Sequence, residues 1–144
     1  MYFRKKILRL SESDASGVLY FAQQFRMAQE LFEEYLEETG ISLRESLEKG
    51  EYLLPVVHAE ADFFAPIKVG DELELGLQLA RLGNSSFTLR CLFKSVGSDR
   101  IVGTTTIVHV AIARSSWSKM PIPKSLVSVL EALGPLVSET NETV

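Results

Sequence analysis

The sequence has a single cysteine, Cys91, among its 144 residues. One thiol cannot form a disulfide within the chain and has no second cysteine beside it for a metal pair, which is typical of a reducing compartment. No apolar run approaches the roughly 20 residues that cross a membrane, and no signal peptide is recognisable in the first residues. We therefore expect a cytoplasmic protein with no membrane partner, no metal site and no cofactor.

The chain also lacks an excess of positive charge. It has 15 Lys and Arg against 19 Asp and Glu, a net charge of −4, and no basic block. A partner with a phosphate backbone is therefore not expected, and nucleic acid is excluded as a ligand. The length and the 46% content of hydrophobic residues suit one globular domain, which we place at residues 1–137, followed by a polar and disordered tail at 138–144.

One long helix dominates the pattern. Apolar residues recur at spacings of three and four between Ser13 and Glu38, which predicts a largely buried helix face. These residues are Val18, Phe21, Phe25, Ala28, Phe32 and Tyr35. Charged side chains crowd the second half, whereas Val18–Gln24 has none, so we expect the helix start to lie in a dry environment. Ser16 is expected to be its N-cap.

The remaining pattern is mostly that of strands. Alternating apolar residues and turn signals predict strands at 2–10, 51–64, 73–79, 87–93 and 101–113, and short helices at 41–49 and 124–133. In the last strand, alternate residues from Val102 to Ile112 are expected to share one face. The predicted class is α+β, with an antiparallel sheet wrapped around one long helix.

Pro55 marks a sheet edge. Proline cannot donate to a strand ladder, so the apolar strand at 51–64 should begin with a bulge or lie at a subunit edge. An exposed apolar edge invites pairing with another chain. A homo-oligomer, at least a dimer, is therefore expected.

The segment that opens the long helix resembles a known family. Asp14–Phe21 has the pattern D-x-x-G-V-x-Y-F and resembles the hot-dog-fold acyl-CoA thioesterases of the 4-hydroxybenzoyl-CoA thioesterase type, over about residues 3–115. Three further segments, 54–66, 70–71 and 109–113, look most like the 1,4-dihydroxy-2-naphthoyl-CoA thioesterases of phylloquinone biosynthesis. The resemblance implies a five-stranded hot-dog sheet, subunits paired into a continuous sheet, a tetramer in many members, and active sites at the subunit interface. It also puts Asp14 in the position of the catalytic acid, while Glu12 stands where many relatives have a first aspartate.

Thioester hydrolysis needs a base or nucleophile and a place for the carbonyl oxygen. Asp14 would attack the carbonyl directly or activate a water, and the sequence leaves both open. The backbone N–H of Phe21, or one near Gly17, would hold the oxyanion at the positive end of the helix. Gly17, which has no Cβ, would let a bulky acyl group approach the backbone.

The expected acyl pocket lies against the uncharged helix start. Its candidate substrate-binding residues are Val18, Tyr20, His58, Phe63 and Phe64. Aromatic side chains offer flat apolar walls, which favour an aromatic acyl-CoA, most like 1,4-dihydroxy-2-naphthoyl-CoA. No basic residue can be assigned individually to the CoA phosphates.

Several alternatives remain open on the sequence. Asp14 could be an ordinary turn or capping acid, and His58 and His109 read most simply as hydrogen-bonded strand histidines. A general short- or medium-chain acyl-CoA thioesterase and a non-catalytic acyl-CoA-binding module share the same pattern. A hot-dog dehydratase is disfavoured, because neither histidine lies near the helix start.

Overall fold

The computed structural model describes residues 1–134, so the predicted tail at 138–144 lies outside the described residues. The elements are β1 (Tyr2–Ile7), η1 (Leu10–Glu12), α1 (Phe21–Glu38), α2 (Leu43–Lys49), β2 (Tyr52–Leu53), β3 (Val56–Phe63), β4 (Glu72–Leu82), β5 (Ser86–Ser95), β6 (Ile101–Val110), β7 (Ile112–Ala113) and α3 (Lys124–Glu131). None of the helices described is long and apolar enough to cross a membrane.

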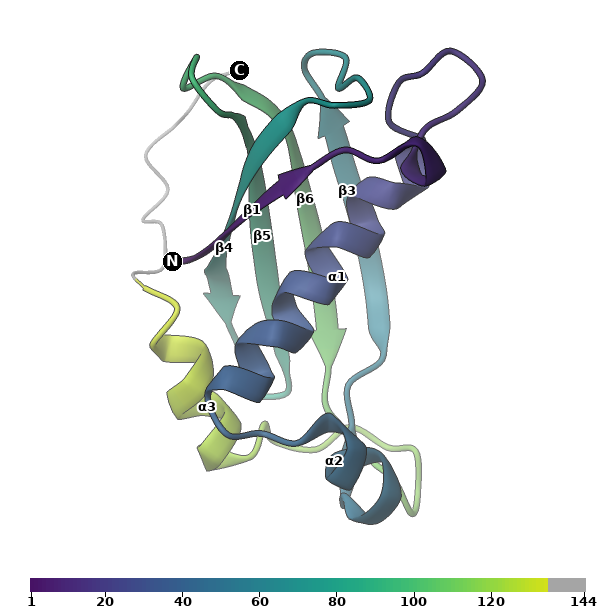
Figure 1. Ribbon diagram of the computed structural model, residues 1–144. Helices are drawn as coiled ribbons and strands as arrows, with labels where there is room; N and C mark the ends of the chain where they lie inside the picture. Colours follow the sequence, from purple (N-terminus) through teal and green to yellow (C-terminus); the bar gives the residue numbers. More distant parts are fainter. Residues whose placement is uncertain (135–144) are drawn as a thin grey trace.

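One antiparallel sheet carries the fold. Its five strands run in the order β1-β4-β5-β6-β3, and α1 crosses one face of it (Figure 1). The helices α2 and α3 gather at the end of the sheet where α1 finishes, whereas the loop before α1 lies at the opposite end (Figure 1). The predicted α+β architecture, a sheet wrapped around one long helix, is confirmed.

The core forms between α1 and alternate residues of β4 and β5. Ala28, Leu31 and Phe32 of α1 are each 3% exposed, and Phe93 of β5 is fully buried. The Phe32 ring lies 6.0 Å from that of Phe87, in a tilted arrangement. A buried Leu or Phe side chain contributes about 1.5–3 kcal/mol of apolar transfer free energy, so this interface holds the helix on the sheet.

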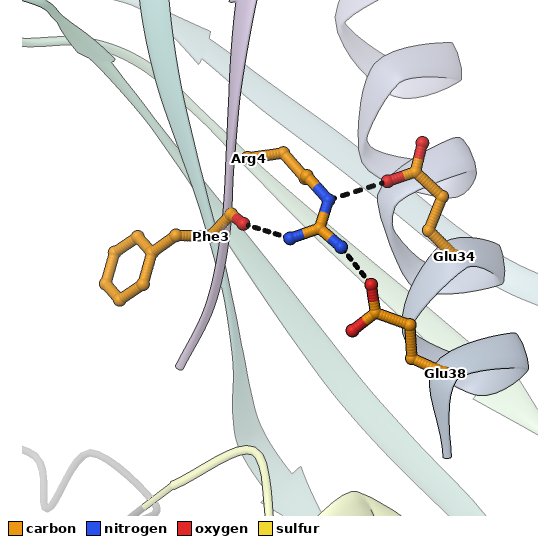
Figure 2. Close-up of polar contacts among 4 residues, drawn as sticks. All are labelled: Phe3, Arg4, Glu34 and Glu38. Carbon is orange, nitrogen blue, oxygen red and sulfur yellow. Dashed lines mark hydrogen bonds and ion pairs between the residues drawn. The ribbon is translucent and has the colours of Figure 1, made fainter. Parts of the chain in front are cut away.

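A charged contact ties the edge strand β1 to α1. Arg4 of β1 pairs with Glu38, and its Nε lies 3.4 Å from Glu34 Oε2, while Nη1 donates to the Phe3 carbonyl at 2.9 Å (Figure 2). The Arg4 and Glu34 side chains are 44% and 53% exposed. Exposed pairs contribute about 0–1 kcal/mol, so this contact orients β1 more than it stabilises the fold.

Pro55 has the effect predicted for it. The expected strand at 51–64 is divided at Leu54-Pro55 into β2 and β3, and the register shifts between Val56 and His58. β3 is an edge of the five-stranded sheet. The predicted bulge and edge position are both confirmed.

The start of α1 differs from the prediction, whereas the shared face of β6 agrees with it. The helix begins at Phe21 rather than near Val18, because Leu19 N donates to Ile67 O at 2.7 Å and holds the preceding chain extended. In β6 Thr104, Thr106, Val108 and Val110 pair with the even-numbered residues of β5 and so share one face, as predicted. The side toward α1 is formed by Thr105, Ile107 and their strand neighbours, which pair with the core residues of β5.

Candidate active site

The loop before α1 is closed on itself by backbone hydrogen bonds. Asp14 N donates to Val18 O at 2.8 Å and Tyr20 N donates to Glu12 O at 2.9 Å, with a bridge between Ser13 and Leu19. Gly17 at the tip has φ +77°, a conformation that residues with a Cβ rarely adopt. A Cβ there would meet no atom within 4 Å, so this glycine is required by the backbone turn. The closed loop sets Asp14 opposite Val18, in the segment that leads into α1.

Asp14 presents a carboxylate to solvent. Its Oδ1 accepts hydrogen bonds from Ser16 N at 2.8 Å and Ser16 Oγ at 2.5 Å. These bonds favour the charged form and lower the pKa of Asp14 below its ordinary value. No hydrogen bond to Oδ2 is found within residues 1–134, which leaves that oxygen for chemistry. Ser16 is therefore a partner of Asp14, and its predicted role as N-cap is wrong.

The start of α1 has no side-chain cap. Tyr20 occupies the N-cap position and makes no capping hydrogen bond through its side chain. Among the described residues, the backbone N–H groups of Phe21 and Ala22 have no acceptor. Free N–H groups with the positive end of the helix dipole suit a developing oxyanion, as predicted for Phe21.

Glu12, which stands in place of a first aspartate, is occupied elsewhere. Its carboxylate lies 2.8 Å from Lys6 Nζ and accepts from Arg9 N at 2.9 Å. The backbone carbonyl of Glu12 also accepts a hydrogen bond from Tyr20 N. Glu12 thus supports the loop between β1 and α1 and makes no side-chain contact with Asp14.

A cleft of about 210 Å³ opens beside this loop. It is lined by Val18, Leu19 and the segment 63–67, which begins with the last residue of β3. The two walls are held together by the bond from Leu19 to Ile67 and by Val69 N donating to Gly17 O at 3.0 Å. Three of the predicted pocket residues, Val18, Phe63 and Phe64, therefore do lie around one cleft.

Two other predicted residues lie outside that lining. The Tyr20 and Phe21 rings pack on each other with centroids 4.9 Å apart, and they are 45% and 58% exposed. Within one chain the helix start is therefore open to solvent. The expected dry environment is wrong for the subunit as far as it is described, because no element within residues 1–134 covers the helix start.

The two histidines have different environments. His58 on β3 is exposed, with Nε2 3.7 Å from Glu60 Oε2, and it does not line the cleft. It makes no hydrogen bond with the described residues, so the expected bonding of this histidine is wrong. His109 is 3% exposed and its Nδ1 lies 2.9 Å from Leu54 O, as expected of a strand histidine. Burial lowers the pKa of His109 and keeps it neutral.

A second apolar cleft, of about 220 Å³, lies at the other end of α1. Its walls come from α1, α2 and β2, and include Phe32, Leu43 and Tyr52. None of the predicted catalytic residues is near it. Across residues 1–134, no cluster of three His, Cys, Asp or Glu side chains is placed to hold a metal ion.

Sequence reasoning missed one buried polar contact near the site. Gln24 of α1 is fully buried, and its Nε2 donates to Asp62 O at 3.1 Å and Thr104 O at 3.0 Å. Gly103 lies directly against this side chain. A glutamine on the inward face, one turn after Phe21, was the available signal, since buried polar groups must find partners.

Comparison with known proteins supports the same family. A family model of the thioesterase-like superfamily matches residues 8–131. The chain is 37% identical over 129 residues to a 1,4-dihydroxy-2-naphthoyl-CoA hydrolase of Prochlorococcus marinus (strain NATL2A), covering 85% of this chain and 82% of that protein. It is 32% identical over 126 residues to the hydrolase of that name from Synechococcus elongatus, covering 87% and 91%.

Solved structures agree. The crystal structure of a 1,4-dihydroxy-2-naphthoyl-CoA thioesterase from Synechocystis superposes with a TM-score of 0.84 at 29% identity, covering 90% of this chain and 94% of that one. A crystal structure of a thioesterase-like protein from Prochlorococcus marinus gives a TM-score of 0.83 at 31% identity, covering 92% and 96%. The predicted family resemblance and the hot-dog fold are confirmed.

Proposed function

Because the chain belongs to the thioesterase-like superfamily, we propose that it hydrolyses 1,4-dihydroxy-2-naphthoyl-CoA to 1,4-dihydroxy-2-naphthoate and CoA. The observation that carries this proposal is the meeting of three features at one place. An ionised carboxylate, an uncapped helix start and a cleft with an aromatic wall all adjoin the loop at residues 12–20. The relatives with this substrate in their names span nearly the whole chain.

Asp14 has two chemically balanced routes. As a nucleophile, its free Oδ2 attacks the thioester carbonyl, the tetrahedral oxyanion collapses to expel the CoA thiolate, and water hydrolyses the mixed anhydride. As a general base, Asp14 takes a proton from water while the hydroxide attacks the same carbon. The thiolate, with a thiol pKa near ~8.5, leaves without a strong acid in either route.

The oxyanion would be held by the helix start. The free N–H of Phe21 is the donor proposed for it, with the helix dipole adding a fixed positive potential. Asp14 is ionised at neutral pH, as an aspartate ordinarily is, and the hydrogen bonds from Ser16 lower its pKa further, so the reaction needs no prior loss of a proton. The loop thus supplies a base and an electrostatic site together.

The cleft favours a flat acyl group. Phe63 and Phe64 offer aromatic faces, with Val18 and Leu19 on the opposite wall. These two rings are 52% and 41% exposed in one chain, and β3 is an unpaired sheet edge. A second subunit placed against this edge would cover the cleft, so we also assign the protein to a homo-oligomer that completes the acyl-CoA site.

Asp14→Asn tests this function. Asparagine keeps the size and one acceptor for Ser16, so we expect unchanged circular dichroism but a kcat lower by about 10² or more in thiol release from 1,4-dihydroxy-2-naphthoyl-CoA. Asp71→Asn is the matched control, because Asp71 is also a loop aspartate whose Oδ2 accepts a backbone N–H, from Lys68 at 2.8 Å. Retention of more than half the wild-type rate by Asp14→Asn would make this residue a turn acid only.

A further inference from the structure

Gln24 connects the two sides of the candidate site through its side-chain amide. The amide N–H groups donate to Asp62 O on β3 and Thr104 O on β6, which are register partners across these strands. Asp62 directly precedes Phe63 and Phe64, the aromatic wall of the cleft. Gln24 itself lies one turn after Phe21, whose N–H is the proposed oxyanion donor. One side chain therefore joins the oxyanion donor to the acyl wall.

The sheet is shaped to receive this amide. A Cβ on residue 103 would lie 2.8 Å from both Nε2 and Oε1 of Gln24, closer than real contacts allow. Gly103 does not have a left-handed φ, so its backbone conformation does not require glycine. Glycine is needed here because any side chain would collide with the amide of Gln24. Gln24 and Gly103 thus form one complementary pair between α1 and β6.

Stability alone does not explain a glutamine here. Its Oε1 is buried and has no donor among residues 1–134, and an acceptor buried without a partner is unfavourable. An apolar side chain of the same length would fill the position without that cost. The helix start also lacks a side-chain cap. Within residues 1–134, the amide of Gln24 makes the side-chain hydrogen bonds that tie the first turn of α1 to the sheet.

From this geometry we infer that Gln24, seated on Gly103, is a positioning residue that sets the distance between the Phe21 N–H and the wall formed by Phe63 and Phe64. The inference rests on the proposed thioesterase function. Catalytic groups must be held within a fraction of an ångström by their supporting contacts, and small displacements reduce rates strongly. Loss of the amide should therefore impair both oxyanion stabilisation and acyl selectivity.

Gln24→Met tests this role, because methionine keeps length and volume but removes both hydrogen bonds. We expect kcat for 1,4-dihydroxy-2-naphthoyl-CoA to fall about tenfold or more. We also expect a loss of selectivity. The kcat/KM for 1,4-dihydroxy-2-naphthoyl-CoA divided by the kcat/KM for octanoyl-CoA should fall at least threefold, which is about the effect of losing one aromatic stacking contact. That ratio does not depend on how much of the enzyme is folded, so loss of stability alone would leave it unchanged.

Two companions complete the experiment. Gln78→Met is the matched control, since Gln78 is a buried glutamine of β4, away from the cleft, and both kinetic values should stay as in wild type. Gly103→Ala displaces the amide from the other side and should lower the same ratio, so it tests the inference if Gln24→Met does not fold.

A wild-type enzyme that releases no thiol would overturn the proposed function and with it this inference. An active wild type with the ratio within twofold in both variants would overturn the inference alone.

Discussion

Replacing Phe63 by leucine separates aromatic recognition from simple burial. Phe63 and Phe64 line the cleft beside Val18, and Phe63 is 52% exposed, so leucine keeps an apolar wall without disturbing the core. An aromatic pair contributes about 0.5–1.5 kcal/mol beyond area burial. At 1.4 kcal/mol per factor of ten, this corresponds to a preference of roughly 2- to 12-fold for a flat acyl group.

The expected result is a selective loss. The value of kcat/KM for 1,4-dihydroxy-2-naphthoyl-CoA should fall by roughly 2- to 12-fold in Phe63→Leu, whereas that for octanoyl-CoA should change little. Thiol release measured side by side on both substrates gives the two constants. In the wild type we expect the naphthoyl substrate to be preferred at least tenfold.

Phe3→Leu provides the control. Phe3 has a similar exposure of 49% but lies on β1, the opposite edge of the sheet from β3. It should change neither constant. Equal losses on both substrates in Phe63→Leu would show that the wall acts by burial alone, and a wild type that prefers octanoyl-CoA would refute the naphthoyl assignment and leave a general acyl-CoA thioesterase.

Two further predictions concern the acid and the assembly. In Ser16→Ala, Asp14 loses the hydroxyl donor that lowers its pKa, so the pKa of Asp14 should rise. Activity is lost at low pH as Asp14 gains a proton. This acid limb of the kcat/KM profile should therefore move to higher pH. An unmoved acid limb would mean that Asp14 is not the titrating group. Light scattering at micromolar concentration should show at least a dimer. The reason is that Val56 and Val57 of the edge strand β3 are 48% and 60% exposed, and an exposed apolar edge favours pairing with another subunit. Val57→Lys should shift the protein toward monomer, and a monomeric wild type would rule out a site shared between subunits.

The sequence could predict the elements whose residues alternate cleanly. The leucines of β4 and the residues Phe87–Phe93 of β5 keep a period of two, and α1 keeps its spacing of three and four, because each has one buried face. β6 did not reveal its buried face, since β-branched residues occur on both sides of it. Periodicity reports burial only where the two faces differ in composition.

The start of α1 and the support of the site depend on distant contacts. Val18 fits the helical spacing, yet it lies in the loop because its neighbours are held by Ile67 and by the turn at Gly17. Gln24 donates to carbonyl groups 38 and 80 residues away along the chain. Such bonds involve main-chain oxygens, which every residue has, so no side-chain pattern marks the acceptors.

The uncapped start of α1 has a consequence for protein engineering. A serine or aspartate at position 20 would ordinarily stabilise a helix by about 1 kcal/mol by accepting one of the free N–H groups of the first turn. In this protein such a cap would accept the free N–H of Ala22, directly beside the Phe21 N–H that is proposed to hold substrate oxygen. We therefore expect a screen for heat resistance that selects a better cap at Tyr20 to place a competing acceptor beside that donor and so to select against turnover.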